Sequence, residues 1–161
     1  MIIIAGNYGY SSKVMDIFRH PHNIGEIKDA DAVGKVGNPS CGDLMWMYLK
    51  MGRNKRGEEI IKDAKVKTFG CVAAISTSSV LTDLIKGKTL KEALEVSKQD
   101  IVDVLEGLPS QKIHCSILAI DALREAVYEY YRKKGRVIPK ELRDVHEKNE
   151  MIKKALEHHR F

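Results

Sequence analysis

The sequence predicts an α+β fold: a three-stranded antiparallel sheet with helices packed on one face, plus an extra C-terminal helix. Two observations support this prediction. Residues 32–69 read as three strands joined by short turns, with apolar and polar residues alternating. Beyond residue 71 the apolar residues recur at helical spacing instead. A chain of 161 residues is long enough to form one such domain with a substantial core.

The first helix is predicted over residues 10–19, with Ser11 or Ser12 as its cap. The strands are predicted over residues 32–37, 44–51 and 58–69. In the second strand the period of two places Met45, Met47, Leu49 and Met51 on the inner face, and Trp46 and Tyr48 on the outer face. In the third strand it places Ile60, Ala64, Val66 and Thr68 inward.

The helices after the sheet are marked by their caps and breaks. Thr89 and Glu92 have the spacing of a capping box, and Gly107 with Pro109 ends the helix that follows. The longest helix is predicted over residues 111–132, and Pro139 opens the last one. We therefore divide the chain into a domain at 1–135, in which 1–9 form an N-terminal extension, and a basic helical extension at 136–161.

The distribution of charge argues against a nucleic-acid partner. Residues 1–131 hold 17 Lys+Arg and 17 Asp+Glu, whereas residues 132–161 hold 10 and 5. The net charge of +5 therefore belongs to a tail of mixed sign, which is typical of a solvated helix. No run of about 18 apolar residues is present, so no membrane span is expected and a cytoplasmic location is the default expectation.

The three cysteines all fall at predicted ends of elements. Cys41 lies in the turn before the second strand, Cys71 at the strand-to-helix junction, and Cys115 in the first turns of the long helix. Element ends gather at one edge of a small domain, and helix N-termini favour the thiolate form. We therefore expect the thiols to meet and bind a metal; the alternative is that they are buried core residues.

Asp43 and His114 lie beside these cysteines in the sequence and could add a fourth ligand. Soft thiolates select zinc, copper(I) or iron–sulfur clusters. The chain has no Cys-x-x-Cys pair of the kind found in structural zinc sites, and it has one cysteine fewer than a permanent cluster uses. The set therefore indicates a metal that is held transiently, with Asp43, His114 or an outside ligand in the fourth position.

Three segments carry a resemblance to a known family. They are VGNPSCGD at 36–43, KVKTFGC at 65–71 followed by AAISTSSVLTDLIKGKTLKEAL, and KIHCSILAIDALREAVYEYY at 112–131. Together they resemble the IscU/NifU-type iron–sulfur cluster assembly scaffolds, an IscU-like family that includes the N-terminal domain of NifU. The resemblance runs from about Tyr10 to Lys133.

The resemblance implies a scaffold that is not an enzyme. It would build a transient [2Fe–2S] cluster from iron and sulfur, and transfer it to acceptor apo-proteins. The ligands would be Cys41, Cys71 and Cys115, with Asp43 or His114 completing the site; zinc could occupy the same place.

The resemblance also implies partners and supporting residues. A cysteine desulfurase would deliver the sulfur as persulfide, with Cys115 as the acceptor. Asp43 would keep the cluster labile, and Lys112 would be a basic residue beside the site. Residues 108–112 read Leu-Pro-Ser-Gln-Lys where bacterial relatives have Leu-Pro-Pro-Val-Lys, which argues against a dedicated Hsp70-type chaperone.

Two hypotheses remain beside this interpretation. The chain could be a zinc-binding sulfur acceptor, or interaction module, of a cysteine desulfurase. The last helix carries an apolar stripe that needs a partner, and we expect it to cover Trp46 and Tyr48, in the same chain or in a second copy of a homo-oligomer. The members of the stripe are Leu142, Val145, Ile152 and Leu156.

Overall fold

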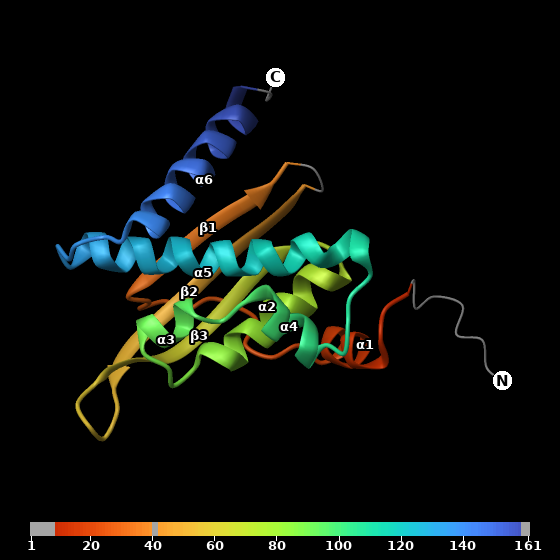
Figure 1. The fold of residues 1–161 in the computed structure, drawn as a ribbon, viewed down its shortest axis with the longest axis horizontal. Helices are drawn as coiled ribbons and strands as arrows, with labels where there is room; N and C mark the ends of the chain where they lie inside the picture. Colours follow the sequence, from red (N-terminus) through yellow and green to blue (C-terminus); the bar gives the residue numbers. More distant parts are fainter. Residues whose placement is uncertain (1–8, 40–41, 159–161) are drawn as a thin grey trace.

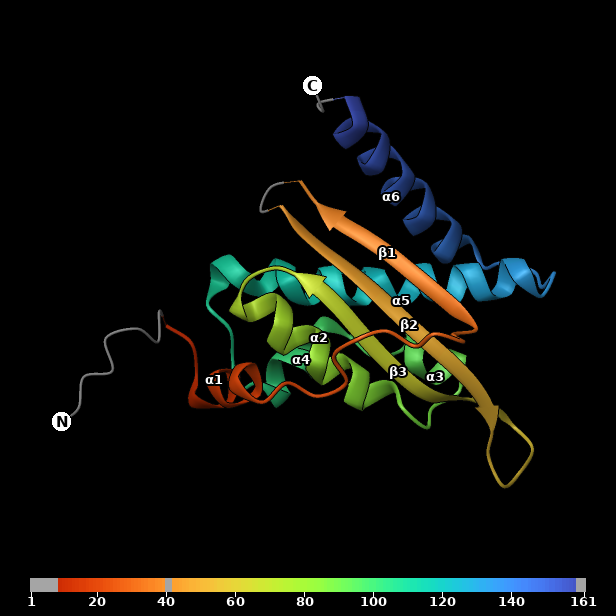
Figure 2. The ribbon, with the colours of Figure 1, turned by 180° about the vertical axis from the view of Figure 1, so that it is seen from behind.

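A computed structural model of the chain describes residues 9–39 and 42–158, and it confirms the predicted α+β fold (Figure 1). The strands form one antiparallel sheet in the order β1-β2-β3. Seen from behind, α1 to α5 lie on one face of this sheet, and α6 lies beside the edge strand β1 (Figure 2). The elements are α1 (Ser12–Arg19), β1 (Ala32–Asn38), β2 (Asp43–Arg53), β3 (Glu59–Phe69), α2 (Val72–Ile85), α3 (Leu90–Leu94), α4 (Lys98–Val104), the 3-10 turn η1 (Ser110–Lys112), α5 (Ile113–Lys133) and α6 (Lys140–His158).

The alternation along β2 gives the sheet one apolar face, as predicted. Met45 and Met47 are fully buried against the helices, whereas Trp46 points to the opposite face and is partly exposed. The register pairs Trp46 with Lys35 on β1 and with Lys67 on β3. Both ammonium groups lie over the indole ring, 5.1 and 5.4 Å from its centroid. Cation–π contacts therefore cover part of the face that the last helix was expected to cover.

A β-bulge changes the inward positions at the start of β3. The register shifts between Lys50 and Met51, where β3 has one extra residue, Lys62. Because one extra residue inverts the alternation, Ile61 is fully buried and Ile60 is only partly buried. The prediction that Ile60 points inward is therefore wrong. The predicted inward positions on the other side of the bulge that are buried are Ala64 and Val66.

Helix α5 crosses β1 in very close contact at Gly34. A Cβ atom at this position would stand 2.3 Å from the carbonyl oxygen of Ala122 and 2.4 Å from the amide nitrogen of Ala126. Both atoms belong to the backbone of α5, so neither can move aside without shifting the helix. Only glycine permits this approach, and the approach fixes the height of α5 above the sheet.

Replacing Gly34 by alanine should therefore destabilise the fold by about 3 kcal/mol, because the added methyl group clashes with helix backbone. Gly52→Ala is the matched control. A Cβ there would meet the Cβ and Cδ of Lys62 at 3.1 and 3.2 Å, with no helix backbone among the nearest atoms, and a change below about 1 kcal/mol is expected. Urea denaturation of the two variants measures both values, and equal losses would contradict this account.

Helix α6 packs against α5 and the edge strand β1. Leu142 at its start joins the buried core, and Leu156 near its end lies close to Gly37 of β1. The prediction that this helix covers Trp46 and Tyr48 within one chain is therefore wrong. Coverage of that face by a second copy stays a prediction.

Buried carboxylates on α5 explain where α6 lies. Glu125 accepts hydrogen bonds from His146 at 2.6 Å and from the amide of Asn149 at 3.2 Å. Asp121, one turn earlier, pairs with Lys148 at 3.3 Å. Buried carboxylates need such partners, because an unpaired one carries a large desolvation cost. The tail helix therefore supplies polar partners to α5 as well as an apolar stripe.

The connection between α5 and α6 is anchored at Arg136. Its guanidinium binds both carboxylate oxygens of Glu59, at 2.7 and 3.2 Å. It also lies over the rings of Tyr130 and Tyr131, 5.3 and 5.9 Å from their centroids. A bidentate, ring-stacked arginine is held firmly, so the root of α6 is tied to the start of β3.

Two predictions of the sequence concern residues or boundaries that the described part of the chain does not test. The N-terminal extension at 1–9 falls almost entirely outside the described residues. The division of the chain at residue 135 stays a prediction. Among the helices within 9–39 and 42–158, none has the length and apolar character needed to cross a bilayer.

Candidate metal centre

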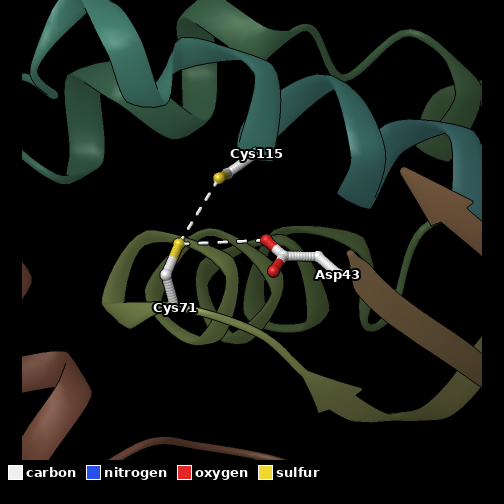
Figure 3. A group of neighbouring side chains, drawn as sticks. All are labelled: Asp43, Cys71 and Cys115. Atoms are coloured by element: carbon white, nitrogen blue, oxygen red, sulfur yellow. Dashed lines mark hydrogen bonds between the residues drawn. The ribbon is translucent and has the colours of Figure 1, made fainter. Parts of the chain in front are cut away.

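Three predicted ligands meet at one end of the sheet (Figure 3). Asp43 begins β2, Cys71 lies between β3 and α2, and Cys115 is in the first turn of α5. The two sulfur atoms are 3.7 Å apart, and the Cys71 sulfur is 3.9 Å from Oδ2 of Asp43. One donor atom from each residue lies within 4.8 Å of the other two. These three side chains are called the thiol site below.

The third predicted thiol, Cys41, lies outside the described residues, so its role as a ligand stays a prediction. The residues on either side of positions 40 and 41 are described. Gly42 has a φ of 73°, which favours glycine, and its amide donates to the carbonyl of Asn38 at 2.8 Å. This turn delivers Asp43 to the first position of β2.

Gly70 makes room for the carboxylate. A Cβ at this position would lie 2.7 Å from the Cβ of Ala74 and 3.1 Å from the Cγ of Asp43. Any larger residue would therefore displace either the first turn of α2 or the carboxylate itself. The Gly-Cys pair thus places the Asp43 carboxylate against the thiol of Cys71.

The surroundings of Cys71 favour its thiolate. Its pKa is lowered to about 5, chiefly by the hydrogen bond with Cys115, against the opposing effect of burial. The amide of Ala74 and the ammonium of Lys112 also favour the anion, whereas the charge of Asp43 opposes it. Cys71 is the N-cap residue of α2 and is partly exposed, and Cys115 is buried. At neutral pH the site therefore holds at least one thiolate, the form that binds metal.

Lys112 and Tyr10 lie within electrostatic reach of the thiols. The pKa of Lys112 is raised, chiefly by the Cys71 thiolate, which agrees with the expected place of this lysine beside the site. Burial and the Cys71 thiolate raise the pKa of Tyr10, while Lys112 lowers it. Sequence reasoning missed Tyr10. A single tyrosine before a helix cap has no pattern that separates it from an ordinary core residue.

His114 lies at the margin of the thiol site. Its Nε2 is 3.6 Å from the sulfur of Cys115. Asp43 belongs to the set of residues whose donor atoms all lie within 4.8 Å of one another, whereas His114 does not. This geometry favours Asp43 over His114 as the oxygen or nitrogen donor next to the two sulfurs.

The spacing of the two sulfurs fits a single metal ion. Metal–sulfur bonds of about 2.3 Å at a tetrahedral angle separate two sulfurs by about 3.8 Å. The observed separation is 3.7 Å, so both thiols could bind one ion with little movement. A carboxylate oxygen at 3.9 Å from one sulfur can supply a further ligand by a small rotation.

The hydroxyl groups of the nearby segment 76–79 donate hydrogen bonds to backbone carbonyls. Ser76 donates to the carbonyl of Val14 at 3.2 Å, and Ser78 donates to that of Ala74 at 2.7 Å. Thr77 also donates to backbone carbonyls, including that of Cys115 at 3.3 Å. The bonds of Ser76 and Thr77 hold α2 against α1 and α5, whereas the bond of Ser78 stays within α2.

Alkylation of metal-free protein tests the charge state of Cys71. Because thiolate is the nucleophile and the pKa is about 5, the rate of alkylation at Cys71 should stay high from pH 8 to pH 6 and fall by half near pH 5. Iodoacetamide labelling followed by peptide mass spectrometry measures this profile.

Cys115→Ala is the control, because it removes the largest cause of the shift. The midpoint for Cys71 should then move toward that of an ordinary cysteine, about 8.5. A midpoint near 8.5 in the unaltered protein would contradict the assignment.

Comparison with known proteins gives one family. Residues 9–137 match the family model described as NifU-like N terminal domain. The iron–sulfur cluster assembly scaffold protein IscU 1 of Archaeoglobus fulgidus is 53% identical over 128 residues, which cover 80% of each chain. The scaffold protein IscU of Aquifex aeolicus is 44% identical over 131 residues, covering 81% of this chain and 82% of the relative.

A solved structure shares the fold. The crystal structure of a NifU-like protein (N-terminal) from Brucella abortus superposes with a TM-score of 0.63 at 19% identity. The superposition covers 76% of this chain and 94% of that one. At this identity the likeness concerns the fold alone.

Proposed function

We propose that this chain, which belongs to the family of NifU-like N-terminal domains, is an iron–sulfur cluster assembly scaffold. The observation that carries the proposal is the meeting of Asp43, Cys71 and Cys115, whose donor atoms lie within 4.8 Å of one another. Each comes from a different part of the sequence, so the fold itself assembles the site. Iron and sulfide are then the cargo of the protein.

The donor set suits a cluster that is built and passed on. Thiolates of Cys71 and Cys115 bind iron, and Cys41 is proposed as the third sulfur ligand. Asp43 offers a hard oxygen, which binds a sulfur-bridged iron centre less firmly than a thiolate does. A [2Fe–2S] cluster held by three thiolates and one carboxylate would therefore open at the Asp43 position when an acceptor protein offers a cysteine.

Sulfur is proposed to arrive as the persulfide of a cysteine desulfurase. The thiolate of Cys115 attacks the outer sulfur of the donor persulfide, a new S–S bond forms on Cys115, and the donor cysteine leaves as thiolate. Cys71 is the more exposed of the two described thiols, so it is the alternative acceptor. Mass mapping of the persulfide after reaction with a desulfurase distinguishes the two.

Anaerobic reconstitution tests the scaffold assignment. Metal-free protein given ferrous iron and a sulfide source should turn reddish-brown with visible absorption, and should then activate an apo-ferredoxin. Cys71→Ser and Cys115→Ser should each abolish the stable colour, because the remaining donors cannot hold both irons. A protein that stays colourless under these conditions would contradict the proposal.

Asp43→Ala tests the source of lability. Losing the weak oxygen ligand should make the cluster persist several-fold longer and slow its transfer, because His114, the other candidate donor, would then complete the site with a nitrogen that iron holds more firmly than a carboxylate oxygen. The decay of visible absorption and the rate of apo-ferredoxin activation measure both effects. Asp16→Ala, at an exposed aspartate on α1, is the control and should change neither. Faster loss of the cluster from the Asp43 variant would reverse the assignment.

A second candidate is a zinc-binding sulfur acceptor of a cysteine desulfurase. The sulfur separation of 3.7 Å favours it, because this is the spacing that one tetrahedral ion requires. In that case the purified protein is colourless, holds zinc at the thiols and forms no cluster after the zinc is removed with a chelator. Reconstitution after chelation therefore separates the two functions.

The remaining expectations follow from the scaffold role. The protein would have no enzymatic reaction of its own, and would work with a sulfur donor and with acceptor apo-proteins. A cytoplasmic location, a homo-oligomer and independence from a dedicated Hsp70-type chaperone stay predictions. The last of these is tested by measuring how tightly an Hsp70-type chaperone of this kind binds two fluorescent peptides. One carries the bacterial segment Leu-Pro-Pro-Val-Lys and the other carries Leu-Pro-Ser-Gln-Lys, residues 108–112 of this chain.

A further inference from the structure

A second group of potential ligands lies away from the thiol site, where α6 packs on α5. Glu125 comes from α5, and His146 and Glu150 come from α6. One donor atom from each lies within 4.8 Å of the other two. These three residues are called the Glu125 cluster below. The match to the family model ends at residue 137, so two of the three residues of the Glu125 cluster, His146 and Glu150, lie outside the matched region.

The two helices bring these groups together by their geometry. His146 and Glu150 are four residues apart, so they lie one turn apart on the same face of α6. This spacing lets two side chains of one helix bind the same ion. Glu125 faces them from α5 and is almost fully buried, with 6% of its surface exposed.

Neighbouring side chains hold two of the three ligands in place. The ring of Tyr128 stacks on the imidazole of His146, with centroids 3.9 Å apart and planes inclined by 8°. The amide of Asn149 donates to Oε2 of Glu125 at 3.2 Å. The other oxygen, Oε1, is left facing Nδ1 of His146 at 2.6 Å. Ligands of metal ions are commonly oriented in this way by groups behind them.

The charges of the Glu125 cluster are not balanced from within. Glu125 has His146 and Asn149 as partners, but Glu150 is partly buried and makes no hydrogen bond or ion pair with any residue in the described part of the chain. Two carboxylates this close repel each other unless a cation lies between them. The lysines around the cluster do not resolve this, because none forms an ion pair with Glu150 in the described part of the chain: Lys148 pairs with Asp121, and Lys35 and Lys153 line the adjoining groove.

We propose that Glu125, His146 and Glu150 form a binding site for a divalent transition-metal ion such as Zn²⁺. One imidazole nitrogen and two carboxylate oxygens are the donors that such ions accept. The ion replaces the proton shared by Nδ1 and Oε1, and that proton leaves to solvent. A groove of about 320 Å³ between α6 and β1 adjoins the cluster and has room for a water as a further ligand.

A metal ion here would act as a clamp between two helices. Its ligands come from both α5 and α6, so binding favours the docked position of α6 over any other. The proposal does not rest on the scaffold function, because the Glu125 cluster shares no residue with the thiol site. Failure of one proposal therefore leaves the other standing.

Zinc stoichiometry of the full chain tests the proposal. Histidines 158 and 159 are changed to alanine in every sample, because a terminal His-His pair can bind zinc by itself. Metal-free protein is dialysed against buffered zinc and the bound metal is measured. We expect one more zinc per chain than the thiols account for, as judged by repeating the measurement on alkylated protein.

Glu150→Gln is the decisive variant, because it removes a ligand and leaves the hydrogen bonds of Glu125 to α6 intact. It should lose the extra zinc, as should His146→Asn. Glu147→Gln makes the same change of charge at an exposed position of α6 and should retain it. Zinc should also slow amide hydrogen exchange within residues 140–158 of the unaltered chain but not of Glu150→Gln.

The outcomes separate cleanly. Loss of one zinc from Glu150→Gln and not from Glu147→Gln supports the site. The proposal is overturned if alkylated protein binds no zinc, or if Glu150→Gln binds as much as the unaltered chain. In either case the cluster is an ion pair between His146 and Glu125 that only docks the tail helix.

Discussion

The close approach of α5 to β1 at Gly34 is the constraint on which the rest of the structure depends. With no side chain between strand and helix, the backbone of α5 lies directly on the sheet. That position brings Cys115 at one end of the helix to 3.7 Å from Cys71, which belongs to the opposite edge of the sheet. It also places Asp121 and Glu125 where residues of α6 pair with them. One glycine thus sets the geometry on both sides of the long helix.

Much of this architecture could be predicted from the sequence, because strand alternation and helix caps are local signals. The capping box of Thr89 and Glu92 forms as expected, and the inner face of β2 is correct. The bulge at Lys62 could not be foreseen, since nothing in a pattern of period two marks an inserted residue. The helix partner of α6 was missed for a related reason: Asp121 and Glu125 look like ordinary solvated charges until the fold buries them.

The thiol site shows a similar division. Position at element ends was enough to suggest that the cysteines meet, and the structure brings Cys71, Cys115 and Asp43 together. Long-range neighbours such as Tyr10 carry no sequence signal of their own. The preference for Asp43 over His114 likewise depends on distances that only the packing of α5 against β2 sets. The meeting of the ligands could therefore be predicted from where they lie along the chain, whereas the distances that decide between Asp43 and His114 could not.

The anchored Arg136 has a consequence for how tightly α6 must hold. Only three residues separate this arginine from Lys140, where the helix begins. A segment tethered so closely meets its own docking surface at an effective concentration on the order of millimolar. Contacts too weak to join separate molecules are then sufficient to keep α6 docked on α5 and β1. Every 1.4 kcal/mol or so gained or lost changes the ratio of docked to undocked helix about tenfold. The short tether thus makes the end of this chain responsive to small chemical changes at its surface.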